Sequence, residues 1–450
     1  MSSFLKQIKH LLIRFETPIV YSIGLALSAA IAFRLKTSLK TAAFFDAQCV
    51  LKTAKCVMNG ISPYHREVWT ALHIPAPAHS PALSIIFMPV CLFSRVFQNL
   101  FFFFVPLLFF YAFVIMVFYY YGFHPKDYLK PRWSNLPVWF ILMLVLISSP
   151  MMLMLSAGQI SSMAAALLFA ALLFPARDKS VNFILLGLAA ALKYSMLTFQ
   201  APLLLLQKRF RLAFLGFALF AVLVLSVGFW LDGIISAFTE YLYMLLDDIQ
   251  HGSSNSYQHG TDPTFIHIGF FTSDILNFLL KAGVIAAYVF ALWKIYCRGR
   301  ENKSSEPVLH LTCAEWGLFS VMTCIISYHR LHDGVIFMPF LGVLFLEQSK
   351  QAFSGSCRSS ALSKVKAALL LFFLLFWACP RKIIFRIAEI IATKFPTGTE
   401  FFRYGSEKQD GGMLVTFPLL QCMIILMLLL LSWLVFSSHQ TKTDAGQKES

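Results

Sequence analysis

Charged residues are scarce in this chain of 450 residues, and their scarcity excludes a soluble globular protein. Asp, Glu, Lys and Arg make up only 13% of the sequence, whereas 58% is hydrophobic and Phe alone occurs 47 times. A soluble domain of ordinary composition has about 25% charged residues. The mean hydropathy is +0.70, and apolar runs recur from end to end with short charged gaps between them. The composition predicts an all-α, polytopic membrane protein, because helices satisfy their backbone polar groups internally in lipid.

Motifs that would identify other classes of protein are also missing. No Walker sequence and no dinucleotide-binding glycine pattern occurs, so a sugar nucleotide is not the expected direct donor of any group. The nine cysteines show no metal-ligand spacing. Cys49 and Cys56 lie about two helical turns apart, which is too far for a disulfide. The net charge of +15 is explained by basic residues at helix ends, so no nucleic acid partner is expected.

Twelve apolar segments are candidate membrane-spanning helices, and about eleven to thirteen crossings are expected. They cover residues 17–34, 82–93, 100–121, 136–148, 161–174, 181–199, 212–231, 275–296, 309–326, 334–346, 367–379 and 413–436. The shortest cannot cross a hydrocarbon layer of about 30 Å alone and are expected to be tilted or partial helices. The chain is expected to form one transmembrane domain over residues 1–450, with a polar tail at 439–450.

The positions of Lys and Arg predict which gaps face the cytoplasm. The basic gaps are the N-terminus, 175–179, 207–211, 297–303 and 350–366. The outer side then receives residues 35–81, 232–262, 327–333 and 380–412. The basic gap 126–132 falls on the wrong side unless an early apolar stretch is re-entrant or split. We expect a multi-pass protein of the bacterial inner (plasma) membrane, with its site on the extracytoplasmic side.

Asp46 is the most informative residue of the outer segment 35–81. Residues 43–58 are predicted to form a helix on the membrane surface, and Asp46 projects from its apolar half. A carboxylate directed toward the membrane is costly unless a cation or a function meets it. Its position alone favours a helix N-cap, because Asp is a preferred capping residue. A catalytic base is the alternative.

Several short elements accompany Asp46 and carry a family resemblance. They are Gly60-Ile61-Ser62-Pro63-Tyr64, the Pro-rich stretch 75–81, Ser149-Pro150 with Gly158-Gln159, Lys193 ahead of Pro202, and the basic turn 207–211. In this order they make the first half of the chain resemble the GT-C-type membrane glycosyltransferases. The closest resemblance is to glycosyltransferase family 87, which is polyprenol-phosphate-mannose-dependent mannosyltransferase-like. The resemblance implies a GT-C-like helical fold.

The resemblance also implies an activity and a set of residues. It implies transfer of a hexose or pentose, first of all mannose, from a polyprenyl-phosphate-linked sugar donor to a hydroxyl of a glycolipid or glycan acceptor, with inversion. Asp46 is implied as the general base, and a single base suffices because phosphate leaves without protonation. The candidate donor-phosphate-binding residues are His329, Arg330, His332 and Lys193. The candidate substrate-binding residues are Tyr64, His79 and Gln159, and no cofactor or metal is implied.

Most of these residues also have a plain structural interpretation. The turn 327–333 suits a solvated loop near headgroups, Lys193 suits a side chain that snorkels to the interface, and Gln159 suits a helix cap. Asp247 and Asp248, with His251 and His259, suggest a divalent metal site. We predict none, because residues 247–262 are typical of a flexible outer loop.

Two other classes of function compete with the enzyme. A lipid or solute transporter or flippase is the first, but we find neither an internal repeat nor charges within the spans. A non-catalytic assembly subunit is the second, and it leaves the isolated outer carboxylate Asp46 unexplained.

Overall fold

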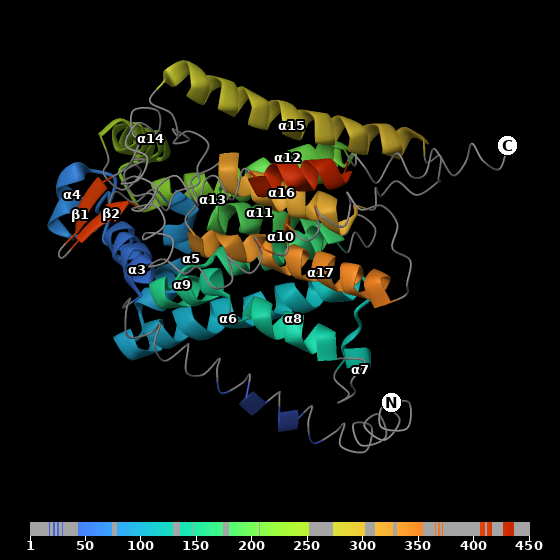
Figure 1. The fold of residues 1–450 in the computed structure, drawn as a ribbon. Helices are drawn as coiled ribbons and strands as arrows, with labels where there is room; N and C mark the ends of the chain where they lie inside the picture. The colour runs from blue at the N-terminus through green and yellow to red at the C-terminus, as the bar shows by residue number, and fades with distance from the viewer. Residues whose placement is uncertain are drawn as a thin grey trace, which may run out of the picture.

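The computed structural model describes most of the chain apart from its two ends. The described residues are 44–73, 79–128, 136–146, 148–173, 180–206, 208–251, 273–301, 311–326, 331–353, 406–409, 412–415 and 426–435, with isolated positions within 18–29 and 365–371. They are helical almost throughout (Figure 1). The exception is an antiparallel hairpin in which β1 (Ser406–Gln409) pairs with β2 (Gly412–Val415). The prediction of a polytopic helical membrane protein is confirmed.

The helices follow one another with short connections. They are α3 (Phe45–Met58), α4 (Arg66–Ala71), α5 (Pro81–Cys91), α6 (Arg95–Tyr120), α7 (Pro125–Tyr128), α8 (Leu136–Leu146), α9 (Ser149–Ala157), α10 (Ser161–Leu173), α11 (Ser180–Leu192), α12 (Met196–Leu206), α13 (Phe210–Leu225), the 3-10 helix η2 (Ser226–Phe229), α14 (Ile234–His251), α15 (Asp274–Glu301), α16 (Cys313–Ile326), the 3-10 helix η5 (Leu331–Ile336) and α17 (Met338–Phe353). A further helical stretch covers Leu426–Val435.

Three of the described helices are long and apolar enough to cross a membrane: Arg95–Tyr120, Phe210–Phe229 and Ile275–Cys297. A fourth crossing is possible through Ile141–Ala157 and Ser161–Leu173, which meet at a bend of 115°. Such a bent pair is the kind of split segment that the basic gap 126–132 predicts. The expected total of eleven to thirteen crossings stays a prediction, because the candidate spans 17–34 and 367–379 lie almost wholly outside the described residues.

Aromatic packing explains part of the high Phe content. Phe169 on α10 lies at the centre of a buried cluster, with ring centroids 4.9 Å from Phe113 of α6, 5.1 Å from Phe340 of α17 and 5.3 Å from Trp316 of α16. Edge and offset contacts of this kind add to the stabilisation that comes from buried area alone. The cluster therefore joins four helices from distant parts of the sequence.

Three predicted segment boundaries are wrong. The predicted span 181–199 is two helices, α11 and α12, because the chain turns at 193–195. The predicted outer loop 232–262 contains the helix α14, whose apolar and polar faces offset each other in average hydropathy. The predicted span 413–436 begins in strand β2, and its described helix covers only Leu426–Val435.

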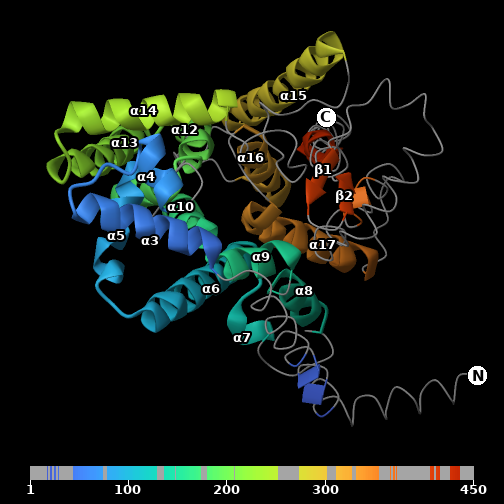
Figure 2. The same cartoon turned by 90° about the vertical axis from the view of Figure 1, so that its left-hand side faces the viewer.

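The helices are arranged so that one end of the bundle carries the outer segment. The long helices run side by side, while α3, α4, α14 and the hairpin gather at one end (Figure 1). Figure 2 looks onto this end and shows α14 lying across it. The end that carries α3 is therefore the place to examine for a site.

Candidate functional site

Helix α3 is held in place by an apolar face that packs on α5. Val50, Ala54 and Val57 lie on this face and are buried, as their spacing on a helical wheel predicts. On the opposite side, Lys52 Nζ donates to the carbonyl oxygen of Leu72 at 2.7 Å, which ties α3 to the end of α4. The predicted helix is confirmed within two residues, but its apolar face meets protein rather than lipid.

Asp46 lies in the first turn of α3, and its partner is a side chain from far along the chain. Its Oδ2 accepts a hydrogen bond from Nε2 of Gln159 at 2.6 Å, and both side chains are partly buried. The N-cap position belongs to Phe44, which has a left-handed backbone, and no side chain caps this helix. The N-cap interpretation of Asp46 is therefore wrong. The carboxylate is fixed by Gln159, a residue that sequence analysis selected separately.

Gly158 explains how Gln159 reaches Asp46. This glycine ends α9 with a φ of 71°, which residues with a side chain seldom adopt. A Cβ added at Gly158 would lie 2.6 Å from Cβ of Ala47. The backbone N–H of Phe44 also donates to the carbonyl oxygen of Ser156 at 3.0 Å. The start of α3 is thus seated directly on the break between α9 and α10.

Lys193 brings a cation to the same break. It follows the last residue of α11, and its Nζ donates to Oγ of Ser161 at 3.0 Å. Ser161 is the first residue of α10, so only Ile160 separates it from Gln159 in the chain. The contacts of Asp46 and Lys193 therefore fall within one three-residue stretch. Sequence analysis named these two residues and Gln159, and the structure brings them together.

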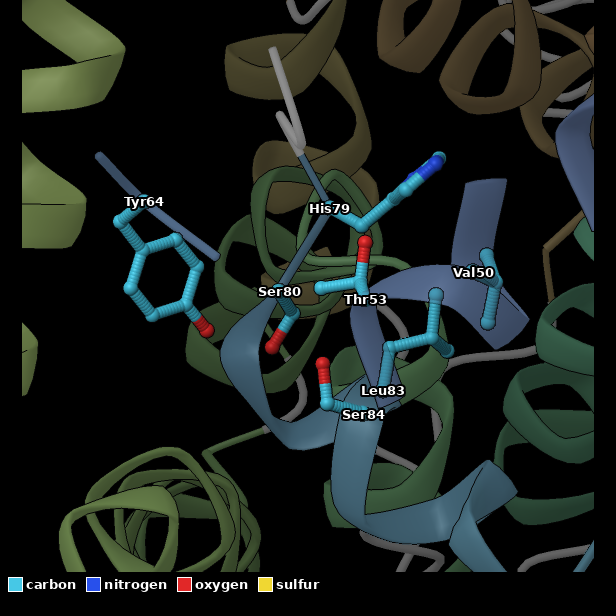
Figure 3. A pocket seen from close by; sticks show the side chains of 7 residues that line it. All are labelled: Val50, Thr53, Tyr64, His79, Ser80, Leu83 and Ser84. Atoms are coloured by element: carbon cyan, nitrogen blue, oxygen red, sulfur yellow. The ribbon is translucent and has the colours of Figure 1, made fainter. Parts of the chain in front are cut away.

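Tyr64 and His79 share a second feature, a small pocket that starts one helical turn beyond Asp46. The pocket is lined by side chains of α3, the turn before α4 and the start of α5: Val50, Thr53, Tyr64, His79, Ser80, Leu83 and Ser84. The hydroxyls of Tyr64, Ser80 and Ser84 point toward one another, whereas the ring of His79 points away from them (Figure 3). The space admits about one water molecule.

The hydroxyls in this pocket are incompletely satisfied. Tyr64 and Ser80 are buried, and within the described residues neither hydroxyl has a hydrogen-bond partner. Such groups usually mark a bound water or ligand atom, because an unpaired buried hydroxyl is costly. Burial raises the pKa of Tyr64 above its ordinary value, so the phenol stays protonated and can donate. Tyr64 is too enclosed to stack on a sugar and acts through its hydroxyl.

Glu240 on α14 is a part of this region that sequence analysis missed. Its Oε2 accepts from Oγ of Ser62 at 2.5 Å, and its Oε1 accepts from Oγ of Ser236 at 3.0 Å. His65 Nε2 lies 3.4 Å from the same carboxylate. The neighbouring Tyr241 packs edge-on against Tyr64, with ring centroids 5.3 Å apart. Helix α14 therefore clamps the turn that carries Tyr64.

The predicted outer turn 327–333 is only partly described. His329 and Arg330 lie outside the described residues, and His332 lies in η5, where only the backbone is described. Helix η5 packs against α9 and α10, the two helices that flank Gln159. A Cβ added at Gly334 would lie 3.1 Å from Cγ of Pro150, which shows how closely η5 approaches α9. The backbone of His332 is thus carried by an element beside the site.

The residues considered for a metal are spread over the end of α14 and the stretch beyond it. Asp247, Asp248 and His251 belong to α14 and not to a flexible loop, while His259 lies outside the described residues. No group of three or more His, Cys, Asp or Glu arranged to hold a metal ion occurs among the side chains that the structure describes. The expectation of no metal stays a prediction.

Comparison with known proteins identifies the family. The family model for glycosyltransferase family 87 matches residues 78–318, more than half of the chain. The chain belongs to glycosyltransferase family 87. Membership makes it a glycosyltransferase of the membrane. No curated protein and no solved structure matches the chain.

The family 87 match covers only part of the site described above. It includes His79, Gln159, Lys193 and Glu240, but it starts after Asp46 and ends before His329. The contact between Gln159 and Asp46 therefore joins the matched region to the helix that precedes it. The role of Asp46 has to be argued from this contact.

Proposed function

We propose that this glycosyltransferase moves a sugar, first of all mannose, from a polyprenyl-phosphate-linked donor to a hydroxyl of a glycolipid or glycan acceptor, with inversion. We place the reaction on the extracytoplasmic side of a bacterial inner membrane. The observation that supports it is the break between α9 and α10, where Gln159 holds Asp46 and, two residues on, Ser161 holds Lys193. A base and a cation at one turn are the two groups that such a transfer needs.

Asp46 is suited to act as the base. Gln159 fixes its Oδ2, while Oδ1 has no hydrogen-bond partner within the described residues. In the proposed step Asp46 takes the proton of the acceptor hydroxyl as its oxygen forms a bond to the anomeric carbon. The bond from that carbon to the phosphate oxygen breaks on the opposite face, and its electron pair leaves with the phosphate. One displacement of this kind inverts the anomeric centre.

Lys193 is suited to stabilise the departing phosphate. An ammonium group has three N–H donors, and Ser161 holds that of Lys193 at the end of α11. A cation placed where negative charge develops lowers the barrier more than one that binds substrate and transition state equally. We propose His329, Arg330 and His332 as further phosphate contacts.

Tyr64 and His79 are proposed substrate contacts of different kinds. The hydroxyl of Tyr64 is buried beside those of Ser80 and Ser84, so it binds a single water or a single hydroxyl of the substrate. His79 is only half-buried and can reach a larger group. The pocket lies about 10 Å from Asp46 along α3, counted from Thr53 at a rise of 1.5 Å per residue, which is within the reach of a short glycan.

Substitution of Asp46 by Asn tests the base. Asn keeps an oxygen that accepts from Gln159, so the contact and the fold are retained while the proton acceptor is lost. Transfer of radiolabel from polyprenyl-phosphate-mannose in membranes is expected to fall by at least about 100-fold, a typical contribution of a general base. Asp232→Asn is the matched control, because Asp232 is an exposed carboxylate near the same end of the bundle. Equal transfer by Asp46→Asn and the control would remove Asp46 as base.

Lys193→Gln separates the two roles. Loss of a phosphate contact that is already made in the bound donor raises the KM for the donor, whereas loss of the base lowers kcat. We expect Lys193→Gln to change both and Asp46→Asn to change kcat alone. If no variant and no wild-type membrane transfers label from any donor, while labelled lipid still crosses the bilayer, the transporter alternative replaces the enzyme.

A further inference from the structure

Helix α14 has an apolar surface on two opposite sides, which is unusual for a helix at the end of a bundle. One side carries Ala237, Tyr241 and Met244, which are buried against the protein. Their spacing of four and then three residues places them on one face. A narrow polar stripe with Ser236 and Glu240 lies beside this face and makes the contacts to Ser62. The buried face and the polar stripe thus account for one half of the helix.

The other half of α14 is an exposed apolar strip, which we define as Ile235, Phe238, Leu242 and Leu246. Ile235 is 82% exposed. Thr239 lies within the strip, but its Oγ1 donates to the carbonyl oxygen of Ile235 at 2.7 Å, so its hydroxyl is satisfied within the helix. Water stabilises no part of such a strip, and an exposed apolar patch of this kind marks a contact with lipid or protein.

The lipid-facing surface of α13 continues into this strip. Helix α13 and η2 together form a membrane span, Phe210–Phe229. Phe214 on this span is 71% exposed, as expected of a side chain in acyl chains. The span ends at Phe229 and Trp230, which are also exposed, and Trp at the end of a span typically lies at the headgroup level. Four residues later α14 begins at that level.

The orientation of α14 completes the argument. In Figure 1 the helix is seen nearly end-on while α13, α10 and α6 run across the view, and in Figure 2 it lies lengthwise over the end of the bundle. A helix that lies across the ends of the spans runs along the membrane plane. We infer that α14 is an interfacial helix, with the strip inserted into the acyl chains of the leaflet on the side of Asp46. Such helices insert to a depth of about 5–10 Å.

This assignment gives the bilayer surface a part in positioning the site. The lipid-facing side of α14 is opposite the side that carries Glu240 and Tyr241, which hold the turn of Ser62 and Tyr64. The turn is therefore fixed at the level of the lipid headgroups. A phosphate attached to a membrane lipid lies at the same level, whichever sugar it carries.

Fluorescence quenching tests the placement in the full chain. A fluorescent amino acid is incorporated at position 235, 238 or 242, and the protein is reconstituted in phosphatidylcholine vesicles with brominated acyl chains. Phe214 on α13 is the matched position within a span, and Glu67 on α4 is the matched exposed position. We expect bromine to quench all three α14 positions about as strongly as position 214, and most strongly when it lies near the headgroup end of the chain. Aqueous iodide should quench position 67 alone.

Either of two results would overturn the inference. Iodide quenching at 235, 238 and 242 equal to that at 67 would show that the strip faces water. Protection from both quenchers would show that protein covers it. Thermal unfolding of each labelled protein, compared with that of the wild type, establishes that the label has not displaced α14, and position 241 on the buried face should resist both quenchers.

Discussion

At the scale of single residues, Gly158 decides whether Asp46 and Gln159 can meet. Gly158→Ala adds a Cβ 2.6 Å from Ala47 at a φ of 71°. Gly122→Ala is the matched control, because Gly122 has a φ of 80° with nothing within 4 Å of its added Cβ. The control carries only the backbone cost of about 1–2 kcal/mol. Gly158→Ala should cost about 1–3 kcal/mol more through overpacking and should abolish transfer, because α3 is pushed away from Gln159.

Thermal unfolding in detergent and sugar transfer in membranes check this pair. Both variants should melt below the wild type, with Gly158→Ala the lower of the two, and only Gly122→Ala should retain transfer. Equal melting temperatures and equal transfer would show that α3 tolerates a shift, and the seat at Gly158 would then have no part in the site.

The individual site residues could be chosen from the sequence, but their contacts could not. Asp46, Gln159 and Lys193 stand out because polar side chains are rare in an apolar chain. The hydrogen bond from Gln159 to Asp46 joins residues 113 positions apart, and it depends on the bend after Gly158, which periodicity does not reveal. Glu240 was missed because its segment has the average composition of a loop. The apolar residues spaced at three and four through 234–246 were the available signal.

At the scale of elements, the contact between α14 and the turn before α4 is a testable unit. Ser62 and Glu240 form a hydrogen bond to a charged group, which contributes about 1.5–3 kcal/mol. In a double-mutant cycle, Ser62→Ala and Glu240→Ala should each destabilise the protein, and the double variant should lose less than their sum, with a coupling of about 1–2 kcal/mol. Unfolding by denaturant in detergent measures the cycle. Glu67→Ala on α4, an exposed carboxylate, should have no effect.

Additive losses in that cycle would mean that α14 does not hold the turn through Glu240. The edge contact between Tyr64 and Tyr241 would then be the main link between the two elements. Transfer measured on the same variants distinguishes a clamp that positions the site from one that only stabilises it, because the former lowers kcat in a variant that is still folded.

Helices that are apolar all round were predictable, and helices with two kinds of surface were not. Segments such as Arg95–Tyr120 exceed the length needed to cross a bilayer, so their type follows from hydropathy. The breaks at 158–160 and 193–195 involve one or two polar residues, which an average over a window hides. Helix α14 was placed in a loop for the same reason, since its polar stripe lowers the mean hydropathy of a mostly apolar helix.

At the scale of the whole molecule, the helix order fixes which loops lie opposite the site. Helix α10 starts at Ser161 beside Gln159, and α11 returns to Lys193, so residues 175–179 between them lie at the far end. Helix α13 starts after Arg209 and ends at the level of α14, which places 207–211 at the far end as well. Both gaps are basic, and the positive-inside rule assigns them to the cytoplasm. Asp46 is then extracytoplasmic.

Labelling of intact cells with a membrane-impermeant maleimide tests this orientation. Cysteine introduced at Glu67 should be labelled above the background of the native cysteines, and cysteine at Lys208 should be labelled only after the cells are opened. Both positions are exposed, so access to the reagent depends on the side of the membrane alone. The reverse pattern would place Asp46 in the cytoplasm, where nucleotide sugars are available, and the argument for a lipid-linked donor would lose its basis. The expected pattern leaves Asp46 on a side without such a supply, where a sugar carried by a membrane lipid is the donor that can reach it.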